Sequence, residues 1–205
     1  MRPADILRAC ERKGIGQIAV TDHNTLRGAL EMHALAPTRT IIGEEIMTAQ
    51  GELLAYFVTT EVPPGLSAVE TIARLQRQGA VIVIAHPCDR IRRGAWREEE
   101  VAAIAPLVDA IEVFNARCLL PHDNAHALAL AQKYAKLGSV GSDAHSPAEL
   151  GNAVLQLSQP IRDSAGLLAA LATAERHTHL ASPIMHLTSL RAKYHKRLSN
   201  LIRYR

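Results

Sequence analysis

The chain has 205 residues, enough for one sizeable hydrophobic core, since a domain usually takes about 100 to 200 residues. Hydrophobic residues make up 48% and aromatic residues 3%, a composition typical of an α/β protein. No apolar run reaches the roughly 18 residues of a membrane span, and residues 1–15 lack the apolar centre of a signal peptide, which favours a cytoplasmic protein. Cys10, Cys88 and Cys118 lie far apart, which argues against a disulfide framework and a C-x-x-C zinc site.

The two ends of the chain differ in charge. Residues 1–160 carry 15 Lys and Arg against 18 Asp and Glu, whereas residues 161–205 carry 8 against 2. Within 187–205, basic and apolar residues interleave at helical spacing without an acid. We therefore expect a main domain at 1–182 and a basic amphipathic helix at 183–205. This helix is expected to pack on the domain or on a second copy of the chain, with binding to nucleic acid or anionic lipid as the alternative.

Strands and helices are predicted to alternate along the chain. Apolar runs of strand length occur at residues 17–20, 40–46, 52–58, 80–85, 109–114, 138–142 and 153–157. Segments with helical character separate most of them, at residues 3–13, 25–35, 67–78, 97–104, 122–137 and 164–175. This alternation predicts a mainly parallel sheet, with a single hairpin formed by the second and third strands.

Polar residues of metal-binding type follow the predicted strands at their C-terminal ends. In chain order they are Asp22 and His23, Glu44 and Glu45, His86, Glu112 with Asn115 and Arg117, and Asp143 with His145. In α/β barrels this end of the strands carries the active site. His, Asp and Glu together form the ligand set of divalent metals such as Zn²⁺, Mn²⁺ and Fe²⁺. One such residue alone can be structural, but their recurrence at five strand ends predicts a metal site.

The motifs TDHNT, GEEI, AHP, EVFNAR and GSDAH resemble, in order and approximate spacing, those of the PHP family, the polymerase and histidinol phosphatase domain. They span Thr21 to His145. The resemblance implies a distorted seven-stranded (β/α) barrel that hydrolyses a phosphoester with two or three divalent ions, of Mn, Zn, Fe or Mg. It places five residues on metal-ligand positions: His23, Glu45, His86, Asp143 and His145.

The resemblance also implies roles around the metals. Asp22 would orient the ring of His23, and Arg117 would grip a phosphate with two hydrogen bonds. Of the arginines that follow the AHP motif, Arg90 is expected to contact phosphate, the alternative being a solvated loop charge. The residues expected to act in the chemistry are thus Asp22, Glu45 and Asp143, and those expected to bind substrate are Arg90, Asn115 and Arg117.

The chain departs from the family pattern at its beginning. The family's first strand ends in His-x-His and is followed by an Asp, and neither feature precedes or overlaps MRPADILRAC. We therefore expect a barrel without its first strand, with weak metal binding and slow turnover. An upstream start in the reading frame that encodes this strand would explain the pattern and restore both properties.

Three further features remain open at this stage. Glu52 can add a ligand if the register of the hairpin turns it toward the site. His122 and His126 have the i, i+4 spacing of a helical metal site, but lack a third ligand nearby and also fit a polar surface stripe. His177 and His179 can replace the missing His-x-His, or belong to a surface edge segment.

The leading functional hypothesis is a metal-dependent phosphoesterase that acts on a small phosphorylated metabolite or nucleotide through metal-activated water. A nucleic-acid exonuclease that uses the basic tail is one alternative, and a non-catalytic binding or assembly module is the other. The sequence contains no G-x-S-x-G, G-x-G-x-x-G or Walker motif, which argues against a serine hydrolase and the common nucleotide-binding folds.

Overall fold

The computed structural model describes residues 1–89, 91–92 and 95–182, so Arg90 and the helix predicted at 183–205 lie outside the described residues. Its elements are α1 (Pro3–Arg12), β1 (Ile18–Val20), α2 (Arg27–Leu35), β2 (Thr40–Met47), β3 (Glu52–Tyr56), α3 (Ala68–Gln76), β4 (Val81–Ile84), α4 (Glu98–Ile104), β5 (Ala110–Asn115), α5 (Pro121–Lys133), β6 (Leu137–Gly141), β7 (Ala153–Gln156), α6 (Ser164–Thr173) and β8 (Glu175–Thr178). Short 3₁₀ turns, η1 (Pro37–Arg39) and η2 (Ala105–Leu107), precede β2 and follow α4. The predicted alternation of strands and helices is therefore present, and β8 is an additional strand.

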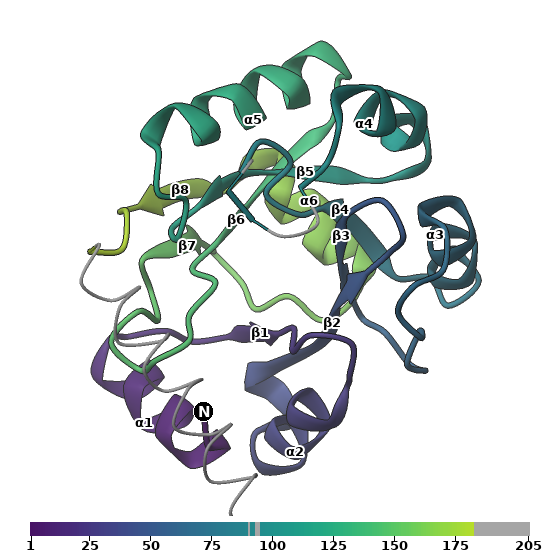
Figure 1. The fold of residues 1–205 in the computed structure, drawn as a ribbon. Coiled ribbons are helices and arrows are strands. Elements are labelled where there is room, and N and C mark those ends of the chain that lie inside the picture. Colours follow the sequence, from purple (N-terminus) through teal and green to yellow (C-terminus); the bar gives the residue numbers. More distant parts are fainter. Residues whose placement is uncertain (90, 93–94, 183–205) are drawn as a thin grey trace, which may run out of the picture.

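Six strands form one curled sheet in the order β1-β2-β3-β4-β5-β6 (Figure 1). The pairs β1–β2, β4–β5 and β5–β6 are parallel, whereas β3 runs antiparallel to both β2 and β4. β7 and β8 form a separate antiparallel pair. Among the described strands none joins β1 to β6, so the sheet is a half-barrel and not the complete seven-stranded barrel of the family.

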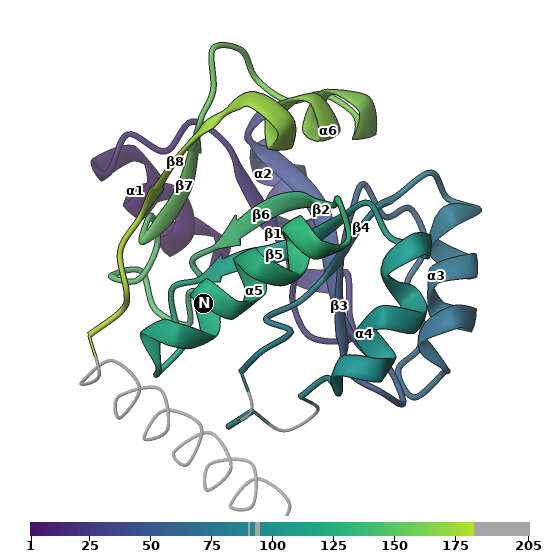
Figure 2. The same ribbon diagram turned by 90° about the horizontal axis from the view of Figure 1, so that it is seen from above.

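Helices cover the outside of the curled sheet, with α1 and α2 near β1 and α3, α4 and α5 around the β3–β5 part (Figure 1). Strand β4 is buried on both faces. Ile82 and Ile84 pack in the cluster that includes side chains of α3, α4 and α5, whereas Val81 and Val83 pack in the cluster that contains Leu167 of α6. Helix α6 thus lies at one end of the sheet (Figure 2), near the start of β4, and leaves the opposite end for the polar residues.

Local sequence signals account for the start and the end of helix α3. The Ser67 hydroxyl accepts a hydrogen bond from the Glu70 backbone N–H and so caps the start of α3. Gly79 follows this helix with φ +69°, a conformation that glycine adopts without steric cost. In the part of the chain that the structure describes, no helix has both the length and the apolar character of a membrane span.

The two edge strands border a large cleft of about 1780 Å³. Its lining includes Ile18 and Val20 of β1 and Val140 and Gly141 of β6. The same cleft reaches the residues that follow these strands, so the candidate site lies beside the unfilled part of the sheet.

Candidate metal centre

Strand pairing brings two acidic residues together on the inner face of the hairpin. In the β2–β3 register, Glu45 lies opposite Leu54 and Met47 lies opposite Glu52. Because side chains two residues apart on a strand share a face, Glu45 and Glu52 project to the same side. Glu52 begins an antiparallel strand, which explains why its side chain reaches the end of the sheet where β2 finishes.

Backbone hydrogen bonds beyond the ends of β1 and β4 place two histidines beside these carboxylates. His23 forms a parallel bridge with Glu45, and the Glu45 N–H donates to the Asp22 carbonyl oxygen at 3.2 Å. The Ala85 N–H donates to the Glu52 carbonyl oxygen at 3.2 Å, which holds the following residue, His86, against the start of β3. Sequence segments as far apart as His23 and His86 thereby meet at one point.

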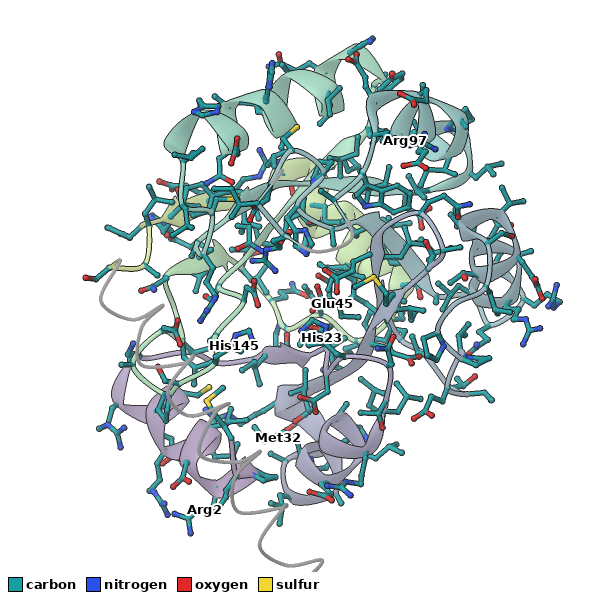
Figure 3. The ribbon with its side chains drawn as sticks, viewed as in Figure 1. Arg2, His23, Met32, Glu45, Arg97 and His145 are labelled. Atoms are coloured by element: carbon teal, nitrogen blue, oxygen red, sulfur yellow. The ribbon has the colours of Figure 1, made fainter. Side chains whose placement is uncertain are left out.

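The four side chains form one compact group. Nδ1 of His23 lies 3.4 Å from Oε2 of Glu45 and 3.4 Å from Oε1 of Glu52. Nε2 of His86 lies 3.2 Å from Oε1 of Glu45 and 3.2 Å from Oε2 of Glu52. His23, Glu45 and Glu52 each offer one ligand atom, and these atoms all lie within 4.8 Å of one another. Figure 3 shows His23 and Glu45 side by side near the centre of the curled sheet.

The charges of this group fit a divalent cation. Burial alone would raise the pKa of Glu52, but hydrogen bonds from His23 and His86 outweigh it and hold the pKa at about 2. Burial would likewise lower the pKa of His86, but Glu45 and Glu52 raise it to about 10. The ionised Glu52 is therefore balanced by the protonated His86, and a divalent cation can replace that proton because it binds neutral imidazole and ionised carboxylate.

The backbone of His86 is held by a further buried carboxylate, Glu112. Its Oε2 accepts the His86 backbone N–H at 2.8 Å, and the Asn115 side-chain amide donates to both Glu112 oxygens at 3.3 and 3.2 Å. Burial raises the pKa of Glu112 to about 7. His86 has φ +26° and Asp143 has φ +45°, a region that non-glycine residues adopt at a cost and that is frequent at functional sites.

Asp143 and His145 form a second group just after the edge strand β6. Oδ2 of Asp143 contacts Nη2 of Arg92 and lies 3.4 Å from Nδ2 of Asn115. Burial would raise the pKa of Asp143, but the Arg92 guanidinium outweighs it and lowers this pKa. The rings of His145 and His23 are 6.4 Å apart between centroids, and Figure 3 shows His145 to one side of the His23–Glu45 pair.

The structure therefore places the five expected ligands along one cleft, but in two groups. His23, Glu45, His86, Asp143 and His145 all line it. The first three converge with Glu52, which sequence analysis left open because its orientation depended on the hairpin register. Asp143 is instead paired with Arg92, a partner that the sequence did not indicate because 51 residues separate the two.

Arg117 and Asp22, two of the expected site residues, have neighbours in the structure that the sequence did not indicate. Nη1 of Arg117 lies 2.6 Å from Oε1 of the buried Glu149, whose Oε2 accepts the His145 backbone N–H at 3.0 Å. Arg117 thus holds the loop that carries His145, and its contact with phosphate stays a prediction. The Asp22 carboxylate lies against Gly28, whereas Nδ1 of His23 faces Glu45 and Glu52, so a role of Asp22 in orienting His23 stays a prediction.

The remaining histidine pairs lie away from the compact group. His122 and His126 are exposed on α5, and Nε2 of His122 lies 3.1 Å from Oδ1 of the adjacent Asp123. His177 lies on β8 at 2.9 Å from the Gln156 side chain of β7, and it lines another part of the cleft. His179 follows this strand and donates its backbone N–H to the Asn152 carbonyl oxygen. The interpretation of His177 and His179 as part of an edge segment agrees with this pairing.

Comparisons with known proteins give matches in sequence and in fold. A family model described as PHP-associated matches residues 121–175. The uncharacterized protein MJ1587 of Methanocaldococcus jannaschii is 37% identical over 117 residues, which is 56% of this chain and 66% of that protein. MJ0417 of the same organism is 36% identical over 163 residues, 78% of this chain and 65% of that protein. The aligned part thus spans slightly less than two thirds of either relative.

Three solved structures share the fold at 17% sequence identity. One, from Bifidobacterium adolescentis, is described as a metal-dependent phosphoesterase (TM-score 0.60; 83% of this chain and 90% of that chain). The others are PsfC from Pseudomonas syringae (0.61; 95% and 89%) and an amidohydrolase from Chromobacterium violaceum with bound sulfate and no metal (0.61; 87% and 93%). The family match over residues 121–175 and the five motifs between Thr21 and His145 support an assignment to the PHP family, and the solved structures show that the chain shares their fold.

Proposed function

We propose that the protein is a metal-dependent phosphoesterase that acts on a small phosphorylated metabolite or nucleotide. The observation that carries the proposal is the convergence of His23, Glu45, Glu52 and His86 at the wall of a broad cleft. Manganese, zinc, iron and magnesium are the candidate metals, and the mixed nitrogen and oxygen ligands suit the first three best. When bound, a divalent cation supplies a Lewis acid for the phosphoryl oxygens and lowers the pKa of a bound water toward neutrality.

The protein's own residues would orient the donors and manage protons. Glu45 and Glu52 fix the two imidazoles between them, and Glu112 fixes the His86 backbone. Nδ1 of His145 lies 2.9 Å from the Asp143 carbonyl oxygen, which can only accept, so Nδ1 carries the proton and Nε2 is the basic nitrogen. Since the His145 side chain is 27% exposed in the cleft, Nε2 is placed to take part in ligand binding or proton transfer there.

The structural neighbours support the reaction class without fixing the substrate. One neighbour is described as a metal-dependent phosphoesterase, and another holds a sulfate, a tetrahedral oxyanion with the shape of phosphate. The breadth of the cleft, about 1780 Å³, leaves room for a nucleotide as well as for a smaller ester.

Phosphate release tests this function. Protein freed of metal with a chelator and then loaded with Mn²⁺, Zn²⁺ or Fe²⁺ is expected to release phosphate from p-nitrophenyl phosphate or from members of a panel of sugar phosphates and nucleotides. Glu52→Gln should abolish the release, whereas Glu99→Gln, an exposed carboxylate of α4, should leave it unchanged. Metal-loaded protein that releases no phosphate from any member of the panel would exclude the proposal in favour of a binding module.

The same preparation tests the nuclease alternative. An exonuclease that uses the basic residues at 183–205 would shorten single-stranded DNA or RNA, and its affinity for the strand would fall steeply with salt because released counterions drive the binding. Hydrolysis of the small esters alone, with weak and salt-independent binding of strands, would exclude this alternative.

A further inference from the structure

The two groups of candidate ligands differ in how their negative charge is balanced. In the compact group, the ion pairs of Glu45 and Glu52 are with the imidazoles of His23 and His86, which in their neutral form are ligands of divalent cations. Asp143 faces a guanidinium, which cannot be deprotonated in a protein. The permanent positive charge beside Asp143 thus occupies a position that a second cation would otherwise take.

Arg92 is held in this position by contacts on both sides. Its Nη2 contacts Oδ2 of Asp143 and lies 3.4 Å from Oδ1 of Asn115, while its Nε lies 3.0 Å from Oδ2 of Asp89. Asp89 is 3% exposed, and the Arg92 side chain is only 21% exposed. A guanidinium bound to two carboxylates in a partly buried setting keeps its charge.

We infer that Arg92 replaces a second divalent cation, so that this part of the chain binds one cation, at His23, Glu45, Glu52 and His86. A second cation at Asp143 would have to displace the guanidinium or lie against it, and like charges repel strongly in a partly buried site. The inference deepens the proposed function and rests on it for the substrate: Arg92 supplies the second positive charge that faces a phosphoryl group bound between the two groups of residues. Its N–H groups suit that oxyanion because a guanidinium can bind two oxygens at once.

Counting bound metal tests the inference without any turnover. Wild-type protein titrated with Mn²⁺ or Zn²⁺ and measured by elemental analysis should bind about one ion per chain. Arg92→Met removes the charge at similar length and should create a second site, so that the count rises to about two. The second ion should disappear again in the Arg92→Met/Asp143→Asn double variant. Arg92→Lys keeps the charge and should remain at one, as should Arg97→Met, whose side chain is 69% exposed on the same connection between β4 and α4.

A further variant keeps the test decisive if Arg92→Met does not fold. Asp143→Asn in the wild-type background should leave the single ion bound, with less than about a threefold change in affinity. Loss of that ion, a wild-type count of two or more, or a folded Arg92→Met variant that still binds one would each overturn the inference. Binding of inorganic phosphate to the metal-loaded protein provides the second measurement. The Arg92→Met/Asp143→Asn variant, which has neither the guanidinium nor the second ion, should bind phosphate at least about tenfold more weakly than wild type, and Arg92→Lys should lose less. Equal binding by wild type and the double variant would also overturn the inference.

The outcomes separate this inference from the proposed function. A count of one that rises to two in Arg92→Met, without hydrolysis of any ester, would reject the phosphoesterase and leave the charge replacement in place. Efficient hydrolysis by a wild-type protein that binds two ions through Asp143 would reject the charge replacement and support the phosphoesterase.

Discussion

The candidate ligands on the middle strands of the sheet are more deeply buried than those at its two edges. Glu45, Glu52 and His86 belong to β2, β3 and the end of β4, which have neighbours on both sides, and they are 6%, 4% and 4% exposed. His23 follows the edge strand β1, and its side chain is 47% exposed. His145 follows the other edge strand, β6, and its side chain is 27% exposed.

Strand pairing explains this difference. A strand with partners on both sides has its backbone hydrogen bonds satisfied and its side chains fixed on one face, so the donors in the middle are already positioned for a metal. β1 has three residues and pairs only with β2, and β6 pairs only with β5. The edge donors therefore depend on loops and on ion pairs such as Arg117–Glu149 for their orientation.

Removal of a donor from the middle should have the largest effect. Glu52→Gln keeps the size of the side chain but removes a charge that both histidines contact. It should weaken metal binding more than about 100-fold, because loss of a residue that only supports a metal ligand already costs about 10- to 100-fold. His145→Gln, at the edge, should cost less than about tenfold. Calorimetric titration with Mn²⁺ measures both. Equal losses in the two variants would show that the distinction between middle and edge has no functional meaning.

A strand added between β1 and β6 should position the donors at the edges nearly as firmly as those in the middle of the sheet. If the preceding reading frame encodes a strand with His-x-His, the longer form should pair with both edges, gain ligands and raise metal affinity by up to about 100-fold. Hydrogen exchange should show new protection of the amides of β1 and β6, while those of β3 and β4 stay as they are.

Two results would contradict this expectation. One is a reading frame without His-x-His, and the other is a longer form that binds metal and hydrolyses esters no better than the 205-residue form. Either would favour the non-catalytic module, because the cleft would then remain without its additional ligands.

Metal affinity should depend on pH through the middle group. The pKa of His86 is about 10, so this ring holds a proton at neutral pH in the metal-free protein, and the pKa of His23 is raised by its hydrogen bond to Glu52. A metal must displace the His86 proton, and its affinity should therefore rise by at least about tenfold per pH unit between pH 6 and 8. Titrations in buffers of different ionisation enthalpy count the protons released. Affinity that is constant over this range would contradict the assignment of His86 as a ligand.

The order of the elements could be predicted from the sequence because apolar runs alternate with helical segments on a local scale. Glu45 and His86 could be predicted as candidate ligands for the same reason, since Glu45 lies near the C-terminal end of a buried apolar run and His86 directly follows one. The role of Glu52 depended on the hairpin register, and those of Arg92 and Arg117 depended on partners 51 and 32 residues away. No local pattern encodes such pairings, so a residue that the sequence offers as a phosphate contact can belong to a buried ion pair.

The smallest change in stability and metal binding is expected at the contact between the edge strand β6 and its neighbour β5. Gly141 of β6 lies against Glu112 of β5, and a Cβ at Gly141 would lie 2.3 Å from Oε1 of that carboxylate. Gly141→Ala should therefore displace Glu112 and cost about 1 kcal/mol of unfolding free energy, at the low end for overpacking because the displaced atom ends a side chain. The melting temperature should fall by about 2–4 °C, as calorimetry can measure. Gly16→Ala, where a Cβ meets nothing within 4 Å, is the control.

Gly141→Ala should also weaken metal binding a few-fold, because Glu112 holds the His86 backbone. A variant that loses stability but binds metal as the wild type does would show that His86 does not depend on this contact.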